Sequence, residues 1–128
     1  MDKKNLNDAI SAGYDSWILR DKRNLLIGFS IVMHTPDLSH LLLIAIKKDF
    51  QRKGFGSLLL NWCEKKSREK SSGISLEVRS SNDIAISFYK KSNYKCIGIR
   101  KNYYRDKNLC EDAFIMEKLF HKCEQNGK

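Results

Sequence analysis

The sequence predicts a single α/β domain spanning residues 1–128, or an α+β domain with a mixed sheet. Three observations lead to this prediction. First, a chain of 128 residues is long enough for one domain with its own core. Second, the composition is 41% hydrophobic and 30% charged, which is typical of globular rather than disordered proteins. Third, apolar runs of strand length flank segments of helical periodicity, with a strand–helix–strand unit in the middle of the chain.

The first half of the chain is predicted to hold a short helix and three strands. The helix spans residues 4–12 and is ended by Gly13. The third strand is apolar on both faces, which favours a central place in a sheet. Turn residues separate the strands, and Pro36 is among them. The expected strands are 16–20, 25–34 and 40–47.

The second half is predicted to hold two helices and three strands. Apolar residues from Phe55 to Cys63 recur at helical spacing, and residues 71–73 end that helix. Asn82 caps a second helix, and Asn93 suits the left-handed position that follows it. The expected strands are 74–79, 94–104 and 111–119, of which the last two form a hairpin.

Composition argues against several classes of protein. The longest apolar run, Leu41–Ile46, is too short to cross a bilayer, and residues 1–20 lack the apolar core of a secretion signal. The cysteines at 63, 96, 110 and 123 form no CxxC pair, so we expect no metal and a reducing, cytoplasmic location. The net charge of +9 fits a nucleic-acid surface, an anionic ligand or solubility alone. Because the cations are spread along the chain, we assign no direct nucleic-acid binding and no membrane partner.

A glycine-containing joint, QRKGFG at residues 51–56, lies where the third strand passes into a helix. The first turn of a helix has unpaired N–H groups and a positive dipole end, and glycines allow close approach to the backbone. With the charges of Arg52 and Lys53, this combination predicts a phosphate site. The joint lacks the Walker pattern and has only part of the Rossmann pattern. A plain strand–helix turn with solvated cations therefore stays an alternative.

The joint resembles the Q/R-x-x-G-x-G/A motif of the GNAT family of N-acetyltransferases. Three further segments, LEVRSSNDIAISFYKKSNY, IRKNYY and EDAFIMEKL, are similar to the RimI type of that family, which acetylates the N-terminal alanine of a ribosomal protein. The resemblance covers approximately residues 5–119. It implies a mixed, mostly antiparallel twisted sheet with flanking helices, and acetyl-coenzyme A (acetyl-CoA) as co-substrate without a metal.

The resemblance also implies which residues bind acetyl-CoA. Backbone amides of the joint hold the diphosphate. The strand before it presents its main chain to the pantetheine, which leaves its side chains free to fill the core. Asn82 contacts the cofactor as well, and its role as a helix cap is compatible with this contact. The implied residues are Ile44, Ala45, Ile46, Arg52, Lys53, Gly54, Phe55, Gly56, Ser57 and Asn82.

Glu77 and Tyr89 are the candidate catalytic residues. Strand alternation places Glu77 and Arg79 on one face of their strand, and a carboxylate there must be solvated, paired or used. An ion pair with Arg79 or another cation is one interpretation of Glu77, and a core aromatic is one interpretation of Tyr89. The resemblance implies instead that Glu77 is the general base for the amine and that Tyr89 donates a proton to the CoA thiolate.

The last hairpin is the candidate acceptor site. Its NYY and EDA segments resemble the wall of the peptide slot in N-terminal acetyltransferases, which implies that Tyr103, Tyr104, Glu111 and Asp112 bind the acceptor. An exposed hairpin with ordinary cross-strand packing is the alternative. The implied partner is a protein N-terminus, for example that of a ribosomal protein, and a homo-oligomer stays open.

The sequence departs from the family pattern at its start. The first strand and helix of the family have no counterpart here, which we expect to open the acceptor site and to leave a sheet edge bare. Two further functions therefore stay open. One is acetylation of a small amine such as a polyamine, attracted by Glu111 and Asp112, and the other is CoA binding with little turnover.

Overall fold

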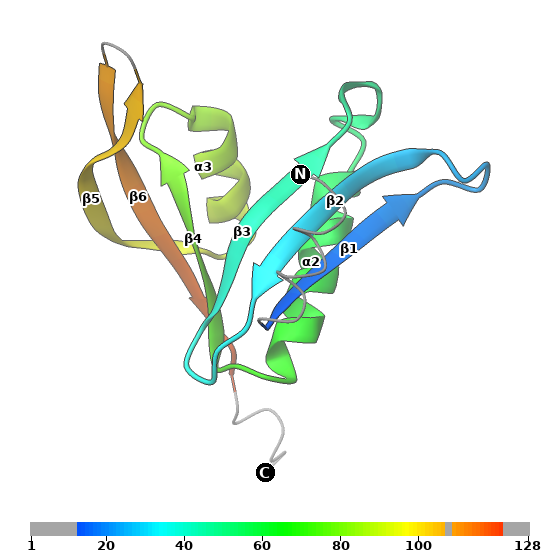
Figure 1. Cartoon of the computed structure of the whole chain (residues 1–128), viewed down its shortest axis with the longest axis horizontal. Coiled ribbons are helices and arrows are strands. Elements are labelled where there is room, and N and C mark those ends of the chain that lie inside the picture. The colour runs from blue at the N-terminus through cyan, green and yellow to red at the C-terminus, as the bar shows by residue number, and fades with distance from the viewer. Residues whose placement is uncertain (1–12, 107–108, 122–128) are drawn as a thin grey trace. The chain divides into compact units, whose positions relative to one another are not determined.

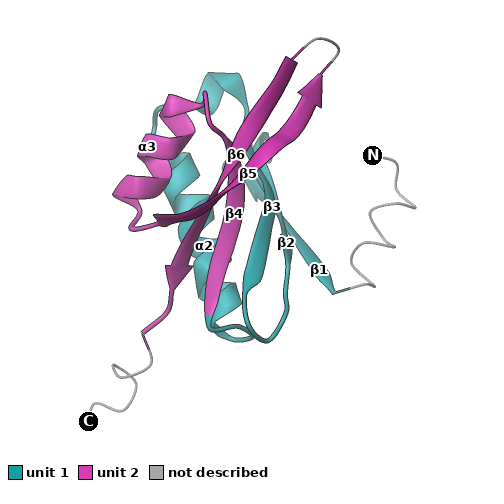
Figure 2. Cartoon of the chain, turned by 90° about the vertical axis from the view of Figure 1, so that its left-hand side faces the viewer, with its two compact units in different colours: residues 1–72 teal, residues 73–128 magenta. Residues whose placement is uncertain are grey.

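The computed structural model describes residues 13–106 and 109–121, which form strands and helices in the order shown in Figure 1. The chain divides into two compact units, residues 1–72 and residues 73–128 (Figure 2). The described part of each unit contains three strands and one α-helix. This mixture of strands and helices agrees with the predicted α/β or α+β class. The helix predicted for residues 4–12 lies outside the described residues.

Unit 1 is an antiparallel meander with a helix packed on it. Its elements are β1 (Tyr14–Arg20), β2 (Leu26–Met33), β3 (Ser39–Ile46) and α2 (Phe55–Arg68). Strand β2 pairs with both β1 and β3, and α2 contacts β2 and β3. The Sγ atom of Cys63 on α2 lies 3.2 Å from Ser30 Oγ on β2, and both residues are fully buried. The apolar core of this unit comprises Ile27, Val32, Leu41, Leu59, Leu60 and Cys63.

Strand β3 departs from the expectation that its side chains fill the core. Leu42 and Leu43 are 52% and 42% exposed. The cause is a β-bulge, because Ile31 pairs with Leu43 while Val32 pairs with Leu41, which leaves Leu42 unmatched. An extra residue interrupts the alternation of faces, so two consecutive leucines lose their burial. Apolar composition alone does not indicate such a bulge.

Gly28 allows β2 and β3 to approach closely near the end of β3. A Cβ atom at this position would meet the carbonyl oxygen of Ala45 and would lie 2.6 Å from the side chain of Ile46. Gly28 and Ile46 are register partners, so the requirement for glycine lies in the sheet itself. This contact fixes the end of the strand that leads into the glycine joint.

Unit 2 is a three-stranded antiparallel sheet with one helix. Its elements are β4 (Gly73–Arg79), α3 (Asp83–Lys91), β5 (Lys95–Asp106) and β6 (Leu109–Leu119). Strand β6 pairs with β4 and with β5. The buried apolar residues of this unit are Ile74, Leu76, Val78, Tyr89, Tyr94, Ala113 and Met116.

The local predictions for unit 2 are confirmed. Asn82 caps α3, because its Oδ1 accepts a hydrogen bond of 3.2 Å from the Ala85 N–H. Asn93 has a φ of 75°, the left-handed conformation that follows a helix. The last two strands form the expected hairpin, although β6 begins two residues earlier than predicted, at Leu109. Residues 107–108 of its turn lie outside the described residues.

Candidate functional site

The glycine joint of unit 1 bends the backbone into the left-handed region twice before α2 begins. The φ angle is 62° at Arg52 and 88° at Gly54, and a single 3-10 turn, η1 (Lys48–Phe50), precedes them. Gly54 is the N-cap of α2, and no side chain caps the helix there. The first intrahelical bond runs from the Leu58 N–H to the Gly54 carbonyl, so the N–H groups of residues 55–57 come before it.

The surroundings of this helix end suit an anion. A Cβ atom at Gly54 would meet nothing within 4 Å, so the space beside the backbone is open. Arg52 and Lys53 are exposed and add positive charge to that of the helix dipole. Phe55 at the first helical position packs edge to face on Phe50 of η1, with ring centroids 6.0 Å apart. The joint is thus a packed loop with an accessible backbone.

Gln51 is a residue of the joint for which the sequence suggested no separate role. Its Nε2 donates a hydrogen bond of 2.9 Å to the carbonyl oxygen of Ile46, the last residue of β3. The side chain therefore ties the loop to the strand end, where Ile44, Ala45 and Ile46 pair with Ser30, Phe29 and Gly28 of β2. The side chains of Ile44, Ala45 and Ile46 are half-buried.

Glu77 in unit 2 has the placement that strand alternation predicts. Leu76 and Val78 on either side of it are each 5% exposed, whereas the Glu77 side chain is 29% exposed. Its Oε2 lies 2.6 Å from Nε of Arg100 on β5, so the ion pair is made with Arg100 and not with Arg79. A hydrogen bond with Glu77 raises the pKa of Tyr103, and the Arg100 guanidinium lies 5.4 Å from the Tyr103 ring. We call Glu77, Arg100 and Tyr103 the Glu77 cluster.

A second cluster of the same composition comprises Arg79 of β4, Tyr104 of β5 and Glu111 of β6. Glu111 Oε2 is 3.3 Å from Nη1 of Arg79, whose guanidinium lies 4.3 Å from the Tyr104 ring. Glu111 Oε1 also accepts a hydrogen bond of 2.7 Å from the Ser81 N–H. The hydrogen bonds at Ser81 and the Arg79 charge hold the pKa of Glu111 below its ordinary value. Burial, together with the nearby Glu77 charge, raises the pKa of Tyr104.

Asp112 contacts residues of β5 that belong to neither cluster. Its Oδ1 accepts a hydrogen bond of 2.9 Å from the Asn102 N–H, and its Oδ2 lies 3.6 Å from Nζ of Lys101. Adjacent residues of a strand point to opposite faces, so Glu111 and Asp112 do not form one acidic patch. Both carboxylates have cationic and backbone partners.

Tyr89 lies in the core of unit 2, which agrees with the interpretation of this residue as a core aromatic. It is 7% exposed, and its ring centroid lies 5.6 Å from that of Tyr94 and 5.2 Å from that of Phe88. This packing fixes the position of the Tyr89 ring on α3.

The structure brings some of the predicted residues together and adds others. Within unit 2 it places Tyr103 on Glu77 and Tyr104 beside Glu111. Arg100 and Ser81 are contributors that sequence reasoning missed. Arg100 was missed because its approach to Glu77 depends on the register of β4 and β5 against β6, which shifts between Cys96 and Gly98, and the alternation within one strand does not give that register.

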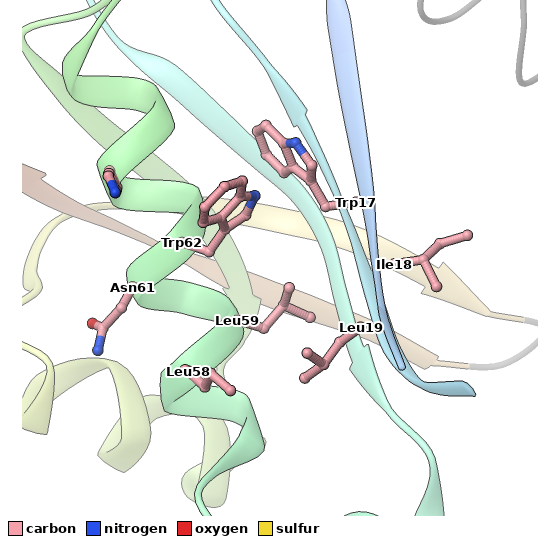
Figure 3. Close-up of a pocket in the computed structure, with 8 residues that line it drawn as sticks. Trp17, Ile18, Leu19, Leu58, Leu59, Asn61 and Trp62 are labelled. Atoms are coloured by element: carbon pink, nitrogen blue, oxygen red, sulfur yellow. The ribbon is translucent and has the colours of Figure 1, made fainter. Parts of the chain in front are cut away.

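A cavity of about 510 Å³ lies in unit 1 between β1 and α2, and none of the predicted site residues lines it. Figure 3 shows Trp17 and Leu19 of β1 facing Leu59 and Trp62 of α2 across it. The two indole rings meet edge to face at 6.4 Å. The residues that line this cavity are mostly apolar.

Two classes of site are absent from the described residues. No group of three or more His, Cys, Asp and Glu side chains there is arranged to hold a metal ion. None of the helices in that part of the chain has the length and apolar character needed to span a membrane.

Comparison with known proteins identifies the family. Residues 4–94 match the acetyltransferase (GNAT) family. The N-alpha-acetyltransferase of Saccharolobus solfataricus is 38% identical over 94 residues, which are 70% of this chain and 54% of that protein. The putative ribosomal protein bS18-alanine N-acetyltransferase of Bacillus subtilis is 36% identical over 104 residues, 80% of this chain and 68% of that one.

The same likeness holds in three dimensions. The crystal structure of the ribosomal-protein-S18-alanine N-acetyltransferase from Escherichia coli has a TM-score of 0.79 and 30% identity, covering 91% of this chain and 76% of that chain. The chain spans about half the length of the archaeal relative and about two thirds of the Bacillus one. With a family match over most of its residues, the chain belongs to the acetyltransferase (GNAT) family.

Proposed function

We propose that this chain is an N-acetyltransferase that moves the acetyl group of acetyl-CoA to the α-amino group of a protein N-terminus. The observation that carries the proposal is the uncapped start of α2 behind Gly54, in a chain that belongs to an acetyltransferase family. The names of its relatives, N-alpha-acetyltransferase and ribosomal protein bS18-alanine N-acetyltransferase, support an N-terminal acceptor. Residues 1–128 then act as one catalytic domain, to which both compact units contribute.

Unit 1 supplies the cofactor contacts in this proposal. The N–H groups of residues 52–57 bind the diphosphate, and Arg52 and Lys53 compensate its charge. The main chain of Ile44–Ile46 binds the pantetheine, and Gln51 holds the end of that strand in place. Asn82 adds a contact from the start of α3 while it caps the helix.

Unit 2 supplies the acid–base chemistry. Glu77 accepts a proton from the acceptor ammonium, and the neutral amine attacks the carbonyl carbon of the thioester. The new C–N bond forms as the C–S bond breaks, and Tyr89 gives the departing sulfur a proton. The second proton lost by the nitrogen restores Tyr89 through solvent. Tyr103 and Tyr104 line the acceptor position, whereas Glu111 and Asp112 hold the surrounding backbone.

An α-amino group is a better acceptor than a lysine side chain for such a site. The pKa of an α-amino group is about 7.7–8.0, whereas that of lysine is about 10.4. Neutralising the lysine at pH 7 therefore costs about 3.4 kcal/mol more. A single carboxylate base favours the group that is easier to neutralise. We propose a ribosomal protein with a small first residue such as alanine as the acceptor.

A thiol-release assay with acetyl-CoA tests the proposal. The acceptors are peptides with different first residues, an N-terminally blocked peptide that carries a lysine, and spermidine. We expect CoA release with free N-termini and little with the other two. Release with spermidine alone would favour a small-amine acetyltransferase, and binding of CoA without release with any acceptor would favour a CoA-binding protein.

A further inference from the structure

Arg100 is the charged residue nearest to the proposed base for which no function has yet been assigned. Its Nε lies 2.6 Å from Glu77 Oε2, and its guanidinium lies 5.4 Å from the Tyr103 ring. A guanidinium keeps its charge at every pH at which proteins fold. The proposed base therefore has a permanent cation in contact with it.

The sheet of unit 2 explains why Arg100 reaches Glu77. Glu77 pairs with Ile115 of β6, which pairs with Gly98 of β5, so Arg100 is the next residue of β5 on that face. Beyond it, the four steps from Arg100 to Tyr104 lie opposite only the two steps from Ala113 to Glu111.

The extra residues of β5 form a fixed arch. Asn102 within it has a φ of 52°, and its N–H donates to Asp112. This arch allows Tyr103, three residues after Arg100, to hydrogen-bond with Glu77 as well.

A carboxylate beside an ammonium group creates a difficulty for acetyl transfer. An opposite charge stabilises the charged form of the amine and raises its pKa, which removes the lone pair that must attack. A lone Glu77 would thus bind the acceptor as an ammonium salt. A cation in contact with Glu77 cancels this effect on the amine.

The other charged groups around Glu77 in unit 2 are balanced. Arg79 pairs with Glu111, and Lys101 pairs with Asp112. Tyr103 and Tyr104 have raised pKa values and are therefore neutral near pH 7. With Arg100 these groups and Glu77 sum to zero charge, and without Arg100 they leave one negative charge at the base.

We propose that Arg100 keeps the acceptor amine in its neutral, nucleophilic form by cancelling the charge of Glu77. The inference rests on the proposed function and deepens it. The proton moves from the acceptor nitrogen to a Glu77 oxygen and then to water, while Arg100 keeps its own protons. Arg100 acts through Glu77, so it is a positioning residue.

The test is the pH dependence of kcat, because this profile reports ionisations in the enzyme–substrate complex. Wild type is compared with Arg100→Gln and Arg100→Lys, using an alanine-first peptide. We expect the rising limb of kcat to move up by about one pH unit in Arg100→Gln, the lower end of the range for a charge close to an ionisable group. Its kcat at pH 7 falls about tenfold and approaches the wild-type value at high pH. Arg100→Lys keeps the limb near its wild-type position.

Two controls separate this effect from a structural one. Lys95→Ala removes an exposed cation at the start of the same strand and should leave the limb unchanged. An acceptor whose amine has a lower pKa in solution should suffer less from Arg100→Gln. Arg100 is 56% exposed, and such surface ion pairs contribute little to stability, so the variants should fold. Arg100→Met is a second variant that keeps the apolar stem.

The outcomes are distinct. A loss of kcat in Arg100→Gln that is the same at every pH and for every acceptor would overturn the inference while leaving the proposed function intact. Unchanged profiles in both Arg100→Gln and Arg100→Met would overturn it as well. Absence of turnover by the wild-type protein with any acceptor would overturn the proposed function and this inference with it.

Discussion

Glu77 and Glu111 are two strand carboxylates with the same kinds of partner and different positions in unit 2. Each contacts an arginine and lies near a tyrosine, yet Glu111 also accepts a bond from the Ser81 N–H. That backbone bond ties Glu111 of β6 to the loop between β4 and α3. Glu77 contacts the side chains of Arg100 and Tyr103 and is the carboxylate better suited to exchange protons with a ligand.

The roles of Glu77 and Tyr89 can be tested by removing one functional group at a time. Glu77→Gln and Tyr89→Phe should each lower kcat by roughly 10²-fold or more, the usual scale for a lost general base or acid, with little change in acetyl-CoA affinity. Phenylalanine keeps the ring that packs on Tyr94 and Phe88. Tyr94→Phe is the matched control, since Tyr94 is a neighbouring buried tyrosine without a proposed role. Wild-type turnover in both test variants would show that the roles are wrongly assigned.

Glu111 should contribute stability that depends on pH. Because its pKa in the folded protein lies below the ordinary value of 4.5, its ionised form stabilises the fold above that pH. The contribution is lost as the pH falls through the lowered pKa. We expect Glu111→Gln to melt at a lower temperature than wild type at pH 7, and the difference to shrink as the pH falls below 4.5 and to vanish below the lowered pKa of Glu111. Thermal melts across this range check it, and a difference independent of pH would contradict the account.

At the scale of elements, the joint between β3 and α2 depends on its backbone conformation. Gly54 has a φ of 88° with open space where a Cβ would lie, so a side chain there costs backbone strain and causes no clash. Asparagine tolerates this conformation and valine does not. Because the loop presents the N–H groups of α2, valine should disturb cofactor binding and asparagine should largely preserve it.

The expected result for this pair of variants is quantitative. Gly54→Val should weaken acetyl-CoA binding by at least about tenfold, or about 1.4 kcal/mol, as measured by titration calorimetry. Gly54→Asn should bind within a few-fold of wild type. Equal affinities for wild type and a folded Gly54→Val would remove the joint from the proposed cofactor site.

Regular elements were predictable from the sequence because they depend on local patterns. The helical spacing from Phe55 to Cys63, the Asn82 cap and the alternation around Glu77 each follow from two or three neighbouring residues. The bulge at Leu42 and the register of β5 between Cys96 and Arg100 depend on pairing between strands, which no local pattern encodes. For this reason the partner of Glu77 was expected to be Arg79 or an unspecified cation, and the structure gives Arg100.

At the scale of the whole molecule, the proposed activity is divided between two compact units. Unit 1 contains the glycine joint proposed to bind the cofactor diphosphate, and unit 2 contains the Glu77 cluster. Neither unit contains both the proposed cofactor loop and the proposed base. On this proposal, acetyl transfer requires both units, and we expect the specificity for the acceptor to depend on the hairpin of β5 and β6.

The most direct test of the account is mass spectrometry on one peptide that offers both kinds of amine. The peptide begins with a free alanine and contains an internal lysine, and it is incubated with acetyl-CoA and the full chain at pH 7. We predict that the acetyl group is found on the α-amino group of the alanine, because that amine is neutralised about 3.4 kcal/mol more cheaply than the lysine. Acetyl found mainly on the lysine would contradict the account.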